Sequence, residues 1–395
     1  MADFNFKKWN LILGWFAFLI AFIAYSLTVE PTVSFWDAGE YILTSSKLQV
    51  GHPPGAPFFQ MMGAFFSIFA TDPTQIGLMI NMMSASASAF TILFMFWSIV
   101  LLIKQVVNNN ESSKEQNIAI LGAAFVGSLS FAFTDSFWFN AVETEVYAMA
   151  TLIMAVLFYL GLRWGNEMFT PRGNKWLILI SFVVGLSFGV HFMGLLTIPA
   201  ISLIYFFKNY RTVTIKNLIL ANLAGIAILL FVFKLLAPNI LRYFSVLEIF
   251  FINSVGLPFN SGSIIAFFLL VGFIIFGIRY TRKKNYVNLN TALLCVTFII
   301  IGFSCWIMLP IRANANVTVN ENNPSSAREL LAYYNLEQYP KTHLFYGPQF
   351  TDQYAGLDKN NPYVDDKPKY EKDEALGKYI IVNDYKNGLQ NYNSR

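Results

Sequence analysis

Residues 76–103 read IGLMINMMSASASAFTILFMFWSIVLLI, a run without a charged side chain that is longer than the roughly 20 residues needed for one membrane-spanning helix. The whole chain has the same character, because 55% of its 395 residues are hydrophobic, 40 are Phe and only 13% are charged. A soluble domain has about a quarter charged residues. The composition therefore excludes a soluble globule and predicts an all-α polytopic membrane protein.

Apolar runs of comparable length recur along the chain. They predict further spans at residues 10–28, 118–134, 146–164, 217–236, 263–279 and 290–309. The stretch 175–207 is too long for one helix and short for two, but two short helices that turn near Gly185 to Gly194 would keep its flanking basic clusters on one side of the membrane. The expected total is about nine spans. The first run is expected to be a retained span, because no small-residue cleavage site precedes Glu30.

The distribution of charge predicts the orientation. With the N-terminus in the cytoplasm, most Lys and Arg residues before Pro310 fall on the cytoplasmic side, and Lys47, Lys234 and Arg242 fall opposite. Acidic residues gather in the predicted outer segments: Glu30, Asp37, Glu40, Asp72, Asp135, Glu143, Glu145 and Glu248. The outer face of the protein is therefore expected to be acidic.

Two parts of the chain are expected from the change in composition. Residues 1–310 would form the transmembrane domain, with a long outer loop at residues 29–75, and residues 311–395 would form a short extracytoplasmic C-terminal tail or partial domain.

Further outer segments are expected within these parts. Residues 237–262 would form a second outer loop, whose aromatic stretch Tyr243 to Phe251 would lie in the membrane interface. In the polar C-terminal region, His343 to Tyr346 and Lys378 to Val382 are expected to be short strands.

The first outer loop carries the most informative stretch, PTVSFWDAGEYILTSSKLQVGHPPGAP at residues 31–57. Asp37 and Glu40 are three residues apart and would share a face of a helix. Beside Trp36, at a half-dry interface, such a carboxylate can have a shifted pKa and can accept a proton from a substrate hydroxyl as a general base. The alternative is that both carboxylates are ordinary loop charges or residues of a helix N-terminus.

His52 follows in the same loop. Pro53, Pro54 and Gly55 come directly after it and predict a rigid, non-helical turn that places an imidazole beside the membrane. The alternative is a structural turn with a hydrogen-bonded histidine.

Glu143, Glu145 and Tyr147 lie at the start of the fourth span, in NAVETEVYAMA. Carboxylates at the entry of an apolar helix are costly and often functional. They are equally compatible with capping the helix N-terminus, where negative charge is favourable.

Two further residues are candidates for a site. His191, in GLSFGVHFMG, lies where the two short helices turn, and a histidine among glycines within the membrane is a site hypothesis, with a backbone-bonded packing histidine as the alternative. Arg312, directly after the last span, is an outer cation that is suited to a lipid phosphate or to an ordinary headgroup.

Several familiar activities have no support in the sequence. It contains no P-loop, no Gly-rich dinucleotide motif, no HExxH and no GxSxG. Cys295 and Cys305 lie in or beside apolar runs and indicate no disulfide framework and no cysteine metal site. No nucleic-acid partner is expected.

Five segments in this order resemble a known family: WDAGE, GHPPGAP, NAVETEVYAM, GVHF and IRANANVTVNENNP. Together they are similar to the bacterial membrane proteins related to the vertebrate plexin-domain protein O-mannosyltransferases, and the resemblance extends to about Gly347. It implies a GT-C-type helical membrane domain in a bacterial inner membrane, with the catalytic loop and the C-terminus in the periplasm.

The same resemblance implies an activity. Asp37 and Glu40 would be catalytic, and a sugar, mannose or another hexose, would pass from a polyprenyl-phosphate-linked donor to a Ser or Thr hydroxyl of a polypeptide acceptor. The donor phosphate and substrates would be bound by residues of the other segments: His52, His191, Arg312, Glu143, Glu145 and Tyr147. A divalent metal is the alternative means of stabilising the leaving phosphate, although no metal ligands are assigned.

Two other readings of the same residues stay open at this point. In a transporter or flippase, the outer carboxylates and His191 would form a pathway through the membrane. In a non-catalytic envelope scaffold, the fold would be retained without activity. Because transporters usually place ionisable groups near the bilayer midplane and show repeat symmetry, the clustering of charge at one face favours transfer over transport.

Overall fold

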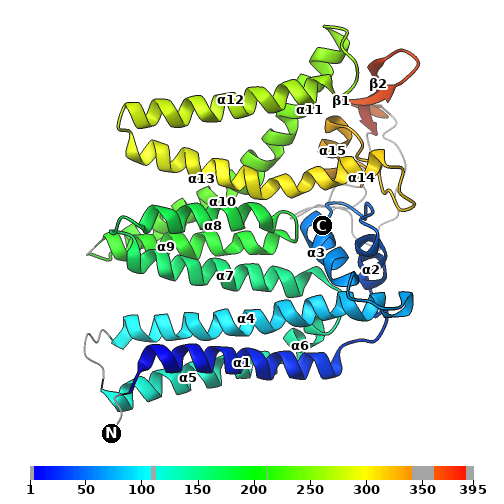
Figure 1. The fold of residues 1–395 in the computed structure, drawn as a ribbon. Coiled ribbons are helices and arrows are strands. Elements are labelled where there is room, and N and C mark those ends of the chain that lie inside the picture. The colour runs from blue at the N-terminus through cyan, green and yellow to red at the C-terminus, as the bar shows by residue number, and fades with distance from the viewer. Residues whose placement is uncertain (1–3, 108–112, 211, 340–359, 388–395) are drawn as a thin grey trace. The chain divides into compact units, whose positions relative to one another are not determined.

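The computed structural model describes residues 4–107, 113–210, 212–339 and 360–387 (Figure 1). Two compact units make up the chain. The first unit contains Met1–Ala237 and Phe273–Glu321, and the second unit contains Pro238–Gly272 and Asn322–Arg395.

The first unit is a stack of apolar helices that lie side by side (Figure 1). They are α1 (Phe6–Thr28), α4 (Ile76–Val107), α5 (Lys114–Ala132), α7 (Val146–Glu167), α8 (Gly173–Ser187), α9 (Thr197–Asn209), α10 (Ile215–Leu230) and α13 (Val287–Phe303). The prediction of an all-α polytopic membrane protein is confirmed.

The described residues contain seven helices that are long and apolar enough to cross a membrane, or eight if the bent pair of α5 and α6 (Asp135–Ala141) forms one span. Helix α8 is apolar but shorter than these. The prediction of about nine spans therefore stays a prediction.

The ambiguous stretch 175–207 forms two helices, as predicted. Helix α8 ends at Ser187, a short 3-10 helix η2 occupies Phe192–Leu196, and α9 follows at once. The break between them includes the predicted turn, because the His191 N–H donates to the Ser187 carbonyl at 2.9 Å.

Most of the predicted outer loop at residues 237–262 is helical. The helix that begins at Ile215 continues to Asn253 through a π-helical turn η3 (Phe231–Leu236) and helix α11 (Ala237–Asn253). The aromatic stretch Tyr243 to Phe251 is therefore part of a helix, and its place in the membrane interface stays a prediction.

Small residues allow the helices of the first unit to approach closely. Ala21 of α1 and Ala89 of α4 are fully buried in one apolar cluster, together with Tyr25. Between α8 and α13, a Cβ atom built on Gly185 or Gly302 would collide with the backbone of the facing helix. This is the packing expected of helices in lipid, where close contact replaces the hydrophobic effect.

The two ends of the first unit differ in charge. Lys104 ends α4, Lys114 begins α5, Arg172 precedes α8, and Lys208 ends α9, all at one end of the stack, which we call the basic end (Figure 1). The opposite end, which we call the site end, contains the short helices α2 (Ala38–Ser46), α3 (Pro57–Ser67) and α14 (Met308–Asn314). The long loop predicted at residues 29–75 contains α2, α3 and a 3-10 turn η1 (Pro73–Gln75).

The second unit combines helix α11, the first half of α12 (Ser261–Lys283), the short helix α15 (Ala327–Tyr334) and a hairpin of β1 (Tyr363–Asp373) and β2 (Lys378–Asn387). The buried carboxylate of Glu248 accepts hydrogen bonds from the Asn260 and Ser263 backbone N–H groups at 2.6 and 2.7 Å. The strand predicted at Lys378 to Val382 is confirmed as the start of β2, whereas His343 to Tyr346 lies outside the described residues.

Candidate active site

The WDAGE segment forms the entry to helix α2. Trp36 has a positive φ of 58° and is 85% exposed, and Asp37 is the N-cap residue, whose carbonyl accepts from the Tyr41 N–H at 2.9 Å. The Asp37 side chain makes no capping hydrogen bond and is exposed. Glu40 lies in the first turn of the helix, as the spacing predicted. The segment therefore presents one carboxylate to solvent and a second one inside the first turn.

Glu40 and His52 form an ion pair across the outer segment. The His52 backbone N–H donates to Glu40 Oε1 at 2.7 Å, and His52 Nδ1 lies 3.0 Å from each carboxylate oxygen. Burial would raise the pKa of Glu40, but the hydrogen bonds and charge of His52 outweigh it and lower the pKa. The hydrogen bond to Glu40 outweighs burial at His52 and raises its pKa. Each partner therefore favours the charged form of the other.

The GHPPGAP turn holds His52 against Glu40. A Cβ atom built on Gly51 would lie 2.7 Å from Glu40 Oε1, so only glycine fits at that position without a shift. Gly55 has a positive φ of 76°, and Pro53 and Pro54 are joined by a cis peptide bond. The turn ends at α3, where the Phe58 N–H donates to the Gly189 carbonyl at 2.8 Å.

A second set of carboxylates precedes helix α7. Glu143 and Glu145 are 3% and 6% exposed, and Glu145 is the N-cap residue of α7 without a side-chain capping bond. The conventional cap expected as the alternative is therefore absent at Glu145. Burial raises the pKa of Glu143.

Glu145 lies next to Asp37. Burial, the charge of Asp37 and the charge of Glu143 together raise the pKa of Glu145 to about 7, although the backbone N–H groups of Val146 and Asp37 oppose the shift. The structure thus brings Asp37 of α2 and Glu145 of α7 together, which the sequence did not predict. One carboxyl group at this place changes charge near neutral pH.

Two buried polar residues, Asn81 of α4 and Thr144 in the segment before α7, stabilise this arrangement. Asn81 Nδ2 donates to the carbonyls of Glu30 and Thr32 at 2.7 and 2.8 Å, and Thr144 Oγ1 donates to Asn81 Oδ1. The Glu30 N–H also donates to the Val142 carbonyl at 2.9 Å. Asn81 and Thr144 were missed in the sequence, because single polar residues in apolar runs look like packing positions.

Two more side chains of the site, Tyr41 and Glu321, were not predicted from the sequence. The ring of Tyr41 lies 5.7 Å from that of His52, and burial followed by the charge of Glu145 raises the pKa of its phenol. Glu321 comes from the segment after α14. Burial and the charge of Glu40 raise its pKa. The site therefore draws residues from α2, α7, the proline turn and the segment after α14.

His191 and Tyr147 form a separate contact at the site end. Their ring centroids are 5.3 Å apart, and Tyr147 is the second residue of α7. His191 Nδ1 accepts from the Met193 N–H at 3.1 Å and caps η2. The backbone-bonded alternative is therefore present, and the other ring nitrogen of His191 is not used in that bond.

Arg312 is bound to the protein backbone. Its Nε donates to the Leu48 carbonyl at 2.5 Å and an Nη donates to the Lys47 carbonyl at 3.0 Å. Val50, two residues after Leu48, forms a parallel β-bridge with Asn320. The Val50 N–H donates to the Val319 carbonyl, and the Glu321 N–H donates to the Val50 carbonyl. Arg312 thus ties the end of α2 to α14, and its contact with a lipid phosphate stays a prediction.

Within the described parts of the chain, no three side chains of His, Cys, Asp or Glu are grouped as metal ligands. The divalent metal that the resemblance offered as an alternative stays a prediction.

Comparisons with known proteins agree with the resemblance. Residues 37–214 match the family model described as the Protein O-mannosyl-transferase TMEM260 N-terminal domain, and residues 340–395 match a family of unknown function. Protein O-mannosyl-transferase tmem260 of Dictyostelium discoideum is 25% identical over 242 residues, which are 57% of this chain and 28% of that relative. The match therefore covers less than a third of the relative's length. No solved structure matches the chain.

The predicted similarity to protein O-mannosyltransferases is thus confirmed. The matched range begins at Asp37 and includes every predicted site residue except Arg312. The roles of these residues are not decided by the match.

Proposed function

We propose that this chain carries the active site of a membrane glycosyltransferase that moves a sugar to a protein hydroxyl. The observation that carries the proposal is the meeting of Asp37 and Glu145 at the starts of α2 and α7, inside the segment that matches the O-mannosyltransferase family. An exposed carboxylate with a second, partly protonated one beside it is suited to accept a proton from a hydroxyl.

The proposed donor is a polyprenyl-phosphate-linked sugar, mannose or another hexose. The site end is formed by short helices at the ends of membrane-spanning ones, where the phosphate and sugar of a lipid would reach the interface while its chain stays in hydrocarbon. The proposed acceptor is a Ser or Thr side chain of a polypeptide.

The reaction follows from the arrangement of groups. The acceptor oxygen attacks the anomeric carbon through an oxocarbenium-like transition state, and the bond from that carbon to the phosphate oxygen breaks. The hydroxyl proton passes to Asp37, and the polyprenyl phosphate leaves with the bonding electron pair. Glu40 raises the pKa of His52 and so favours its protonated form, which makes His52 the proposed cation for the developing phosphate charge. Arg312 acts on the site by holding the end of α2.

Replacing Asp37 with Asn tests the proposal. Transfer of sugar from a polyprenyl-phosphate donor to a Ser or Thr peptide is expected to fall by at least about 100-fold, because the amide cannot accept the proton. Asp135→Asn is the matched control, since Asp135 is an exposed acid in the first turn of α6 and is not among the groups that shift the pKa of Glu145. Full activity of Asp37→Asn, with normal amounts of folded protein, would refute the role assigned to Asp37.

We also propose that the site end faces away from the cytoplasm, in the inner membrane of a bacterium, as the position of the basic end supports. In a chain with Cys295 and Cys305 replaced by Ser, a cysteine at Val33 is expected to react with an impermeant thiol reagent added from the periplasmic side. A cysteine at Thr170, at the basic end, is expected to react only after the membrane is permeabilised. The reverse pattern would place the site in the cytosol and end the proposal for a polyprenyl-linked donor on the periplasmic face.

A further inference from the structure

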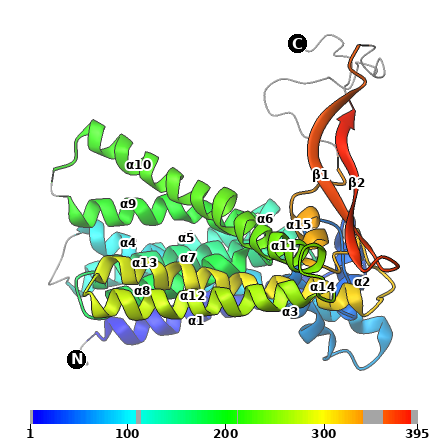
Figure 2. The same ribbon diagram turned by 90° about the horizontal axis from the view of Figure 1, so that it is seen from above.

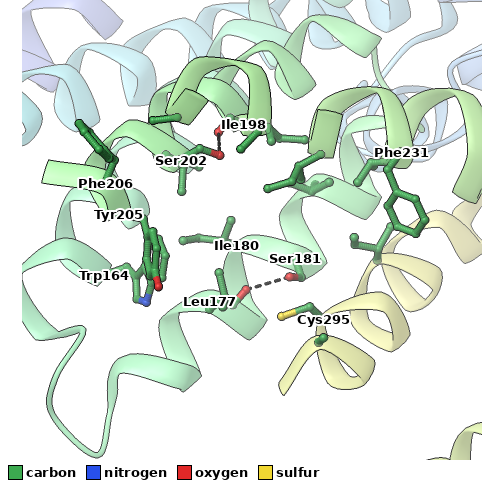
Figure 3. Close-up of a pocket in the computed structure, with 18 of the residues that line it drawn as sticks. Trp164, Leu177, Ile180, Ser181, Ile198, Ser202, Tyr205, Phe206, Phe231 and Cys295 are labelled. Carbon is green, nitrogen blue, oxygen red and sulfur yellow. Dashed lines mark hydrogen bonds between the residues drawn. The ribbon is translucent and has the colours of Figure 1, made fainter. Parts of the chain in front are cut away.

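A large cavity lies inside the first unit, away from the candidate active site. It has a volume of about 710 Å³ and is lined by α7, α8, α9, α10, η3 and α13 (Figure 3). The lining is almost wholly apolar, with Ile180, Ile198 and Phe231 among the labelled side chains. Along α10 it extends from Asn217 to Val232, which is about 22 Å of helix.

The two serines that line the cavity are hydrogen-bonded within their own helices. Ser181 Oγ donates to the Leu177 carbonyl at 2.9 Å, and Ser202 Oγ donates to the Ile198 carbonyl at 3.0 Å (Figure 3). A sugar or a peptide would need polar partners here, because a buried polar group without them costs free energy. The lining is therefore suited to a hydrocarbon chain.

The cavity opens sideways because α10 packs loosely. Within α10, Gly225 is the only buried residue. A Cβ atom built there would touch Pro199 and Ser202 of α9. From this crossing the two helices diverge toward the loop that joins them (Figure 2). Leu220 and Ile228 line the cavity and are 53% and 49% exposed, so a lipid chain can enter between the helices.

The end of the cavity toward the basic end has the features of a membrane interface. The rings of Trp164 and Tyr205 stack with centroids 5.9 Å apart, and those of Phe206 and Tyr210 stack at 5.2 Å. Tyr and Trp concentrate at the level of lipid headgroups. The mouth of the cavity therefore lies where a headgroup would be.

Two cations lie at this mouth. Lys216 is exposed and precedes Asn217, which lines the cavity. Lys208 is exposed in the last turn of α9, and its stem packs beside Gly165, next to Trp164. Charge at an apolar mouth complements a lipid that is both anionic and long-chained.

We propose that this cavity binds one acyl chain of an anionic phospholipid from the leaflet at the basic end, with its phosphate near Lys208 and Lys216. The site is separate from the carboxylates of the candidate active site, and the proposal does not depend on the transferase activity. Such a lipid would fill the gap between α9 and α10 and stabilise the position of α10.

The test measures lipid retention by the full chain in detergent, with native mass spectrometry. Phosphatidylglycerol and phosphatidylcholine with identical acyl chains are compared, and the wild type is expected to retain phosphatidylglycerol more tightly. Ala224→Phe fills the cavity and is expected to abolish retention, whereas Ala227→Phe, on the same helix but outside the lining, is expected to preserve it. Ala221→Leu is a second filling variant in case Ala224→Phe does not fold.

The headgroup contact is tested with Lys208→Gln and Lys216→Gln together. Two lysines near an anionic headgroup predict a roughly tenfold or larger loss of preference for phosphatidylglycerol. Lys283→Gln with Lys284→Gln, at the same end but not beside the cavity, is the control.

Three results would overturn the proposal. They are undiminished retention by both filling variants, equal retention of the two phospholipids by the wild type, and displacement of phosphatidylglycerol by polyprenyl phosphate, which would assign the cavity to a donor lipid.

Discussion

The Glu40 carboxylate accepts hydrogen bonds from both the backbone and the ring of His52, with His52 N at 2.7 Å and Nδ1 at 3.0 Å from Oε1. The two residues belong to segments that the proline turn brings back onto the first turn of α2. Their pairing has a direct consequence for pH dependence, because it lowers the pKa of Glu40 and raises the pKa of His52.

Replacing His52 with Gln is expected to destabilise the protein most near pH 6. The raised pKa of His52 gives stability that is complete below 6.5 and is lost as the pH rises through the raised value. The lowered pKa of Glu40 gives stability that is complete above 4.5 and is lost as the pH falls through the lowered value. The difference in Tm between wild type and His52→Gln should therefore be largest between these values and shrink at about pH 9.

Glu337→Gln is the control for this measurement. Glu337 pairs with Arg328 at 2.8 Å, and arginine does not titrate in this range, so its effect on Tm should be the same at about pH 6 and pH 9. A His52→Gln effect that is equally independent of pH would contradict the ion pair.

Gly51→Ala is expected to disturb the site through one methyl group. The added Cβ would lie 2.7 Å from Glu40 Oε1 and 3.3 Å from Gln60 Nε2, so the Glu40 carboxylate must move away from His52. We expect a loss of about 1–3 kcal/mol in the free energy of unfolding and reduced transfer activity. Gly122→Ala, where no atom lies within 4 Å, should leave both unchanged or slightly raise stability. Normal stability and activity of Gly51→Ala would show that the close approach has no consequence.

Arg312→Ala is expected to loosen the end of α2. Two hydrogen bonds from a charged group are lost, each worth about 1.5–3 kcal/mol, and the carbonyls of Lys47 and Leu48 are left to solvent. Limited proteolysis should cut the segment after Ser46 faster than in the wild type. Arg312→Lys should restore part of the protection, because one ammonium can reach one carbonyl. If Arg312 instead served only to hold a donor phosphate, both variants would lose activity with unchanged proteolysis.

The long helices could be predicted because lipid imposes a simple rule on length and polarity. Even the two-helix solution for residues 175–207 followed from the position of the basic clusters on either side. The continuation of the helix past Ala237 was not predicted, because the apolar run ends there and polar residues such as Asn239 and Arg242 follow it.

The site was predictable in part, because lipid also restricts where ionisable residues occur. Asp37, Glu40 and His52 were predicted because ionisable residues beside an apolar span are costly and often functional. The meeting of Asp37 with Glu145 could not be read from the sequence, since it depends on how α2 and α7 each pack against α4. The role of Arg312 is equally non-local, because its partners are backbone carbonyls 264 and 265 positions earlier in the chain.

Glu145 should make the activity depend on pH near neutrality. Its pKa of about 7 means that its carboxyl is mostly neutral below that value and ionised above it. An ionised Glu145 beside Asp37 strengthens the negative potential at the proposed base and favours transfer of the proton to it. We therefore expect kcat to rise as the pH increases through about 7, and Glu145→Gln to lower kcat and remove this rise.

A stability measurement separates this effect from a general loss of structure. Since the folded-state pKa of Glu145 lies above its ordinary value of 4.5, the wild type loses stability as the pH rises from there to about 7, and Glu145→Gln should not. The Tm of Glu145→Gln relative to that of the wild type should therefore increase with pH over this range, although the kcat of the variant is lower than that of the wild type. Glu115→Gln, in the first turn of α5 at the basic end, should show neither change. A Glu145→Gln enzyme that keeps the wild-type pH profile would mean that the group titrating near pH 7 is not Glu145, and the pairing with Asp37 would then have no part in the reaction.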